Sequence, residues 1–436
     1  MMQVIVFIGF FILSSGLFWS PVVALAAERS GSATLASAET PTIAYPLDLP
    51  PLREVEAMLR AHPAIAAGRA GLRAEQGNAR RLEAGAAEFT LRLGTQKRRE
   101  TTLGSNWSEW DVAMDRPIRS HSKAELDARI GKQGVVGAEF ALGDAMHESG
   151  RALLRSWMGL LREQAQRSEW QAQEALLQRQ RDLVARRVRA GDAPRMELSL
   201  AEAALAQVQA QRQQMQGRLL AAQAEFVRLF PGVSLPAESV AQPLPQAPTQ
   251  PLAFWRERIL EHNHELALAR SESQRMRLLA SRAEADRLGD PSVGMRVASE
   301  RGGIERIGGL YVSIPLPGEA RRAAADSSSA QADAALQREA VVLRRLEAEI
   351  AAGVERAAGS FLAWQRAAAA AEGLQAHATL MERAYALGES ALPEVLNARR
   401  VAREATLGAA LARLEASETR YRLLLDAHLL WPLDDD

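Results

Sequence analysis

Two widely separated stretches of this sequence share one pattern, and that pattern limits how the chain can fold. In each, a long helical pattern reaches a glycine, Gly191 or Gly388, an acidic residue follows, and a proline comes shortly before or at the start of a second long helical pattern. Glycine readily adopts the left-handed conformation that closes a helix, and Asp192 or Ser390 can cap the helix that follows. The sequence therefore predicts two helical hairpins, with tips at 190–198 and 387–395.

The helical patterns that lead into these tips are unusually long. The patterns at about 119–190 and 321–387 would each form a helix about 100 Å long at 1.5 Å per residue, which exceeds a compact domain. Apolar residues such as Trp157, Leu160 and Leu161 keep coiled-coil spacing. Aromatic residues make up 5% of the chain and the formal net charge is zero. This composition is typical of packed long helices, and without a basic excess it argues against nucleic acid as a partner.

In two places the hydrophobic period changes from helical to alternating. Apolar and polar residues alternate at about 87–97 and 107–117, and again at about 292–300 and 307–316. A period of two indicates β-strands, so each pair of strands predicts a hairpin. An amphipathic hairpin usually covers a core, but the sequence offers these four strands nothing obvious to cover.

These elements define a fold class that is mainly α with a small β part, made of two structural repeats of helix, β-hairpin and very long helical hairpin. The apolar start of the chain, followed by small residues, predicts a cleaved signal peptide, with a single transmembrane anchor as the alternative. The chain has no cysteine, hence no disulfide and no thiol for lipid attachment. The predicted organisation is a signal peptide at 1–26, an extended arm at 27–50, a first repeat at 51–230, a Pro-rich linker at 231–251, a second repeat at 252–430 and an acidic tail at 431–436.

No sequence motif indicates an enzyme, a cofactor or a metal centre. A Ser/His/Asp arrangement lacks local support, and no Gly-x-x-x-x-Gly-Lys phosphate-binding loop is present. His262 and His264 stand two residues apart, so they diverge on a helix, and no third ligand lies near them in the sequence. We therefore predict neither catalysis nor metal binding.

Several short motifs, taken in their order along the chain, resemble the outer-membrane efflux protein (TolC-like) family. They are His62-Pro63-Ala64-Ile65 at the opening of the first repeat, Gly289-Asp290-Pro291-Ser292 before a strand, Arg116-Pro117-Ile118 and Ile314-Pro315-Leu316 after the second strands, and the paired tips. The resemblance covers nearly the whole chain after the signal peptide. The absence of a lipid-bearing cysteine is similar to the non-lipidated branch, and the tips and the His-Pro opening are most similar to heavy-metal efflux members.

The resemblance implies a homotrimer in the outer membrane that extends into the periplasm. Three chains of four strands would close a twelve-stranded β-barrel among the outer-membrane lipids, continued by a periplasmic α-barrel. The implied function is passive: a conduit of a tripartite efflux system, working with a periplasmic adaptor (membrane fusion) protein and an RND-type inner-membrane pump. Metal cations or small toxic compounds are the implied cargo. Independently, lone strands in lipid would leave backbone groups unsatisfied, so the strands themselves require oligomerisation, though not the number three.

The resemblance also gives the tips a role as the periplasmic mouth, where the adaptor docks and the channel opens. The residues matched to docking, whose apolar members we expect to be exposed, are Gly191, Asp192, Met196, Leu198, Gly388, Leu392 and Val395. The residues matched to the lining of the aperture are Glu197, Glu394 and Asn397. Three copies of Glu394 would form a negative ring that favours cations. The alternative for Glu394 is a solvated glutamate at a helix start, where the helix dipole stabilises it.

A different class of protein would also contain such long helices. A soluble periplasmic coiled-coil scaffold or adaptor protein would explain the helices and the linker. It would not explain why two alternating hairpins recur at equivalent positions. For the channel, the exported substrate stays open, because in this architecture selection usually belongs to the pump.

Overall fold

The computed structural model describes residues 45–85, 88–102, 104–237 and 243–433. These residues belong to one compact unit, which spans Ile43–Asp436. They form a mainly helical fold with one small sheet, as the sequence predicts. The predicted signal peptide at 1–26 lies outside the described residues, as does the predicted arm at 27–50 up to residue 44.

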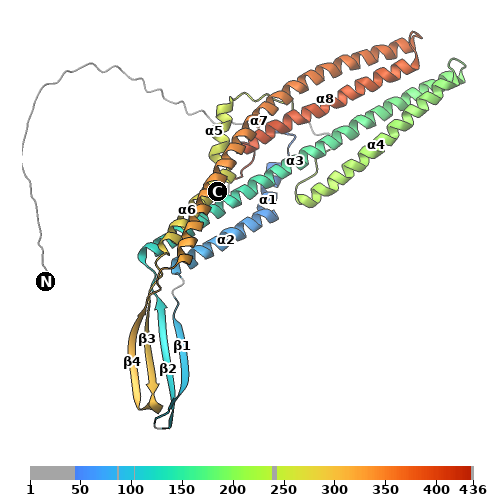
Figure 1. Cartoon of the computed structure of the whole chain (residues 1–436). Coiled ribbons are helices and arrows are strands. Elements are labelled where there is room, and N and C mark those ends of the chain that lie inside the picture. Colours follow the sequence, from blue (N-terminus) through green and yellow to red (C-terminus); the bar gives the residue numbers. More distant parts are fainter. Residues whose placement is uncertain (1–44, 86–87, 103, 238–242, 434–436) are drawn as a thin grey trace, which may run out of the picture. The chain divides into compact units, whose positions relative to one another are not determined.

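One order of elements occurs twice along the described chain, and Figure 1 shows both runs. The first run is α1 (Leu52–Ala61), α2 (Pro63–Ala84), β1 (Thr90–Glu100), β2 (Ser105–Pro117), α3 (His121–Arg189) and α4 (Arg195–Leu229). The second run is α5 (Leu252–His262), α6 (His264–Ala285), β3 (Ser292–Glu300), the short 3-10 turn η1 (Arg301–Gly303), β4 (Glu305–Ser313), α7 (Glu319–Ala386) and α8 (Leu392–Asp426).

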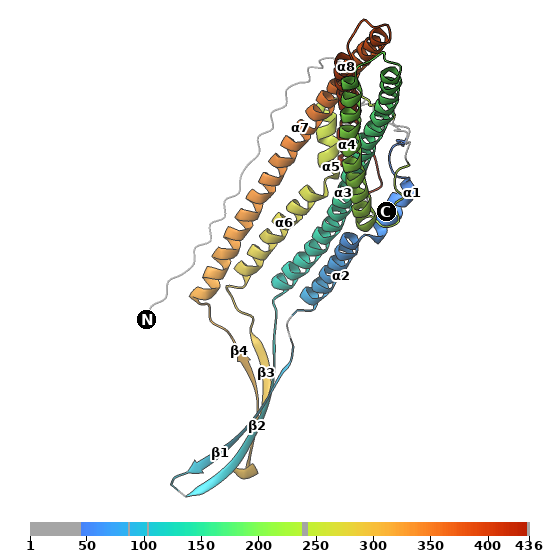
Figure 2. The same ribbon diagram turned by 90° about the vertical axis from the view of Figure 1, so that its right-hand side faces the viewer.

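The two longest helices contain 69 residues in α3 and 68 in α7. Helix α3 packs against α2, α4, α6 and α8, and α7 packs against α5, α6 and α8 (Figure 2). Small residues allow these helices to approach one another closely. A Cβ atom at Gly131 would lie only 2.8 Å from the Cα atom of Ala79, and Ala325, Ala332 and Ala335 are buried along α7. Few of these helices have a strong apolar stripe of their own. Their stability therefore depends on packing against neighbouring helices.

The four strands form one antiparallel sheet in the order β1-β2-β3-β4. Strand β1 starts and ends three residues later than predicted, because Lys97 to Glu100 continue to pair with Ser108 to Ser105 of β2. Strand β4 ends at Ser313, shortly before Pro315, since proline has no N–H group for the ladder. The sheet joins the two runs of elements through the pairing of β2 with β3.

The main core lies where α1, α3 and α8 meet the chain segments that flank the helices. The last residues of the predicted arm enter it: the indole N–H of Trp157 donates to the Asp48 carbonyl at 2.7 Å, and the Tyr421 hydroxyl donates to Asp48 Oδ1 at 2.7 Å. The predicted acidic tail at 431–436 is wrong for its first residues, because Trp431 and Leu433 are buried in this core. These apolar side chains pack into the core although the terminal aspartates, which lie outside the described residues, follow them directly in the sequence.

Within residues 45–433, apart from the short gaps given above, no helix combines the length and the apolar character needed to cross a bilayer.

Candidate functional site

Both tips close with the same backbone arrangement. Gly191 and Gly388 have φ angles of +75° and +79°, the left-handed conformation that the tip pattern predicts. The N–H groups of Gly191 and Asp192 donate to the carbonyls of Val188 and Arg187 at 3.1 and 2.9 Å. The N–H groups of Gly388 and Glu389 donate to Tyr385 and Ala384 at 3.1 and 2.8 Å. This is the Schellman motif in both copies. It provides hydrogen-bond donors for carbonyls that would otherwise be unpaired at a helix end.

The side chains of Asp192 and Ser390 do not cap the helices that follow, so this prediction is wrong. Helices α4 and α8 begin after Pro194 and Ala391, and neither receives a capping bond from the side chain at that position. Asp192 instead accepts from Arg187 Nε at 3.1 Å, and the Ser390 hydroxyl donates to the Met381 carbonyl at 3.4 Å. Both side chains lie too early in the turn, and each strengthens the helix that is ending.

The two tips of one chain pack against each other through a small apolar cluster, which we call the tip cluster: Val184, Ala201, Tyr385, Leu392 and Val395. Leu392 and Val395 are fully buried in it, so the expectation that they are exposed is wrong. They face the other hairpin of the same chain instead of solvent. Leu198 packs against the edge of the cluster, while Met196 is 78% exposed.

A polar link beside the tip cluster joins the first tip to the second. The hydroxyl of Tyr385 donates to Glu197 Oε2 at 2.9 Å, and the guanidinium of Arg187 lies 5.1 Å from the centre of the Tyr385 ring. Burial and the bond to the Glu197 carboxylate raise the pKa of Tyr385 above its usual value. Glu197, which we matched to the aperture lining, is thus held between the hairpins by a neutral tyrosine.

The other two residues matched to the aperture, Glu394 and Asn397, are exposed on the first turns of α8. Glu394 Oε2 accepts from the backbone N–H of Ala391 at 3.2 Å. Asn397 Oδ1 accepts from Arg400 at 3.0 Å. Glu394 therefore stabilises the helix start, and its exposed carboxylate is still available to the surroundings.

The sheet presents two chemically different faces, since residues paired across strands share a face. One face carries a band of apolar side chains from all four strands, with Leu93 at 71% and Leu310 at 84% exposure. We call it the apolar band: Leu91, Leu93, Trp110, Val112, Met114, Val293, Met295, Val297, Leu310 and Val312. Nothing within the described chain covers most of it.

The opposite face carries charged and polar side chains that bind one another. Asp115 Oδ1 accepts hydrogen bonds from Arg92 Nη2 and from the Tyr311 hydroxyl, both at 3.1 Å. Glu109 binds Arg98 Nε at 3.0 Å and accepts from Gln96 Nε2 at 2.8 Å. The alternation of polar residues in the strands was the sequence signal for this face, but the pairing across β1, β2 and β4 could not be foreseen without the register.

In the part of the chain that the structure describes, no group of three or more histidines, cysteines or acidic residues is arranged to hold a metal ion.

Comparisons with known proteins place this fold. No protein-family model and no curated protein matches the sequence. Among solved structures, the chain is similar to the CmeC outer membrane channel of Campylobacter jejuni, with a TM-score of 0.72, 12% identity, and coverage of 88% of this chain and 86% of that one. It is also similar to the outer-membrane channel OprN, with a TM-score of 0.68, 17% identity, and coverage of 88% and 90%.

A third similar structure is the outer membrane protein VceC of Vibrio cholerae, with a TM-score of 0.68, 16% identity, and coverage of 87% of this chain and 94% of that one. The chain therefore has the fold of bacterial outer-membrane channels. The resemblance to the TolC-like efflux proteins that we drew from its motifs is confirmed at the level of this fold.

Proposed function

We propose that this protein is the outer-membrane channel of a tripartite efflux system, a passive conduit that extends into the periplasm and performs no catalysis. The observation that carries the proposal is the two-faced sheet. Its exposed apolar band suits contact with lipid, and its opposite face, with paired charges, suits a water-filled interior. The similar solved structures, which are outer-membrane channels, support the same assignment.

The open edges of the sheet support a closed assembly of several copies. Strands β1 and β4 each have a neighbour on one side only in the described chain. In a bilayer, unpaired backbone groups on such edges would cost several kcal/mol each, and only a closed barrel removes them. Pairing β1 of one copy with β4 of the next closes the ring, and we propose three copies and twelve strands on the basis of the TolC-like resemblance.

The tips are the proposed periplasmic mouth, where an adaptor protein docks and links the channel to an RND-type pump. The turns at Gly191 and Gly388 and the exposed Met196 supply the contact surface. Leu392 and Val395 support that surface from within the tip cluster rather than touching the adaptor. The pump provides the energy, and the cargo we propose is a metal cation or a small toxic compound.

We further propose that Glu394 lines the aperture as a ring of one carboxylate per chain. Glu394→Lys is expected to lower the cation preference of single channels, because each copy reverses one charge in a narrow mouth. The reversal potential in a salt gradient measures this preference. Glu404→Lys, farther along α8, is the matched control for a charge reversal on the same helix. If both variants keep the cation preference of the unaltered channel, Glu394 lies outside the conduction path.

Cell fractionation combined with particle mass tests the proposed function. We expect the protein in the outer-membrane fraction, and its particle in mild detergent should contain three chains after subtraction of the bound detergent. The competing scaffold or adaptor would be found soluble in the periplasm as a monomer or dimer. That result would leave the apolar band without lipid and would end the channel proposal.

A further inference from the structure

Four histidines from distant parts of the sequence meet at one place in the fold. His147 lies in α3, His262 ends α5, His264 begins α6, and His428 follows α8. The centre of the His428 ring lies 5.3 Å from those of His147 and His264 and 5.6 Å from that of His262. We call this group the histidine clasp. It joins the opening of the second run of elements to α3 and to the end of α8.

The backbone at His428 is specialised for this position. Helix α8 closes as the tips do, with the N–H groups of His428 and Leu429 donating to Leu425 and Leu424 at 3.0 and 2.8 Å. The left-handed residue of this motif is glycine at both tips, but here it is His428, with φ of +56°. A side chain disfavours that conformation, because its Cβ atom approaches the following carbonyl oxygen. This strained backbone places the His428 ring against three other imidazoles.

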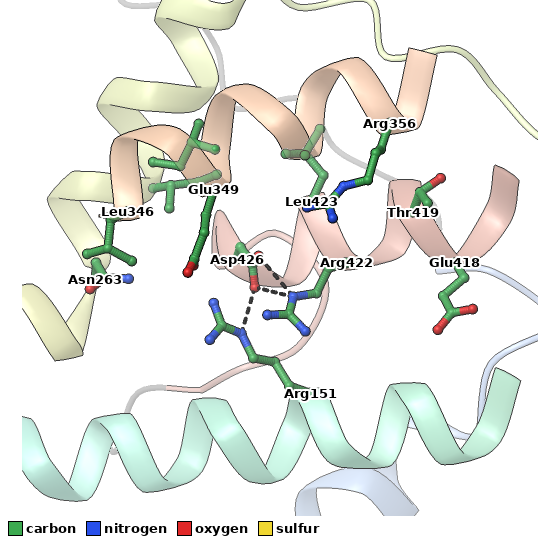
Figure 3. Close-up of a pocket in the computed structure, with 13 residues that line it drawn as sticks. Arg151, Asn263, Leu346, Glu349, Arg356, Glu418, Thr419, Arg422, Leu423 and Asp426 are labelled. Atoms are coloured by element: carbon green, nitrogen blue, oxygen red, sulfur yellow. Dashed lines mark hydrogen bonds and ion pairs between the residues drawn. The ribbon is translucent and has the colours of Figure 1, made fainter. Parts of the chain in front are cut away.

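The electrostatic surroundings of His147 oppose an added positive charge on its ring. His147 is only 5% exposed, and its Nε2 atom has no hydrogen-bond partner. Asp426 Oδ1 lies 3.7 Å from this atom. Figure 3 shows that this carboxylate is already bound by Arg151, at 2.9 Å, and by Arg422, at 3.0 Å. Burial, and then the charge of Arg151, lower the pKa of His147 to about 2.

Acidic groups near the clasp do not offset the lowering of the His147 pKa. The further charged groups on the elements packed around it are Asp144 and Glu148 of α3, Glu261 of α5, Glu265 of α6, and Glu349 and Arg356 of α7. Several are already paired: Glu148 with Arg151, and Glu265 and Glu349 with Arg345. Burial therefore dominates, and His147 stays neutral while the clasp is closed.

A cavity lies at the edge of the clasp. It has a volume of about 500 Å³ and is lined by residues of α3, α5, α7 and α8, and by Asn263 between His262 and His264. Asp426 and Arg151 both line the cavity. Asp426 lies beside His147, and Arg151 binds Asp426. Protons can thus reach the clasp as soon as the side chains separate slightly.

We propose that the histidine clasp is a pH-sensitive fastener that holds the end of α8 against α3 and the α5–α6 junction at neutral pH and releases it on acidification. In the open state, His147 regains an ordinary pKa near 6.5, whereas in the closed state it excludes the proton. The closed state is therefore fully favoured above pH 6.5. Below it, each pH unit shifts the balance toward opening by about tenfold.

Thiol labelling of the full-length chain in detergent tests this proposal. The chain has no cysteine, so Leu433→Cys places one probe in the buried segment that follows His428. Thr102→Cys, in the exposed turn between β1 and β2, corrects for the pH dependence of thiol chemistry itself. The ratio of the two labelling rates is expected to rise about tenfold between pH 7.5 and 5.5.

Histidine substitutions show whether the clasp causes that rise. His147→Gln should reduce it to about twofold or less, while His377→Gln, at an exposed histidine of α7, should keep the full tenfold. A pH-independent ratio in the parent chain, or an unchanged rise in His147→Gln, overturns the proposal. Thermal unfolding at pH 7.5 shows whether each variant folds. His428→Asn, which tolerates a left-handed backbone, should raise the ratio already at pH 7.5, and an unchanged ratio there also contradicts the clasp.

Discussion

Replacing Leu91 with arginine is expected to prevent assembly in the outer membrane. Leu91 belongs to the apolar band and is 61% exposed. A charged residue on the lipid face of a barrel costs about 2–4 kcal/mol near the middle of the bilayer. Each chain of an oligomer would incur this cost. We therefore expect at least a tenfold loss of protein from the outer-membrane fraction, measured by quantitative immunoblotting.

The neighbouring residue provides a matched control for this substitution. Thr90 lies on the same strand but on the polar face, directly opposite Asp115 in the register. Thr90→Arg adds the same charge and a similar volume beside a carboxylate, so we expect near-normal assembly. Equal losses in the two variants would mean that the two faces of the sheet do not meet different media, and the channel proposal would lose its main support.

Replacing both tip glycines with valine is expected to abolish export while leaving the sheet intact. At Gly191 and Gly388 an added Cβ would meet nothing within 4 Å, so any effect comes from the backbone alone. A β-branched residue held in the left-handed conformation costs roughly 1–2 kcal/mol at each tip. The turns should rearrange and displace the tip cluster. Growth of a channel-deficient strain on a panel of toxic compounds and metal salts, complemented by each variant, measures export.

Two glycines within the same hairpins serve as controls for the tip variant. Gly217 of α4 and Gly373 of α7 also have nothing within 4 Å of an added Cβ, but they have ordinary helical backbones. The double variant Gly217→Val and Gly373→Val should therefore keep export. Full export by the tip variant would show that neither turn needs its left-handed residue, and the docking role of the tips would fail.

The elements that follow from local patterns were the ones that the sequence could predict. The change from a helical period to alternation locates the strands to within a few residues, and the glycine at each tip specifies a left-handed turn that the structure contains. These features depend on residues close together in the chain. They can be predicted without knowing which distant residues they contact in the folded chain.

Contacts between distant segments could not be predicted in the same way. Leu392 and Val395 were expected to be exposed because their partners, such as Val184, come from a helix far away in the sequence. The third and fourth imidazoles beside His262 and His264 come from α3 and from the end of α8. The burial of Trp431 likewise depends on a core assembled from residues as far apart in the sequence as Leu49 and Leu433.

The pairing of β2 with β3 has a consequence for the order of events during biogenesis. Val112 faces Val297 across this pair, so in the proposed exported channel the sheet joins segments that would leave the translocation machinery at very different times. The first hairpin, with its apolar side chains unprotected, cannot complete the sheet until β3 and β4 have also emerged. Because such distant pairings form slowly, the strands are expected to need a periplasmic chaperone during this interval.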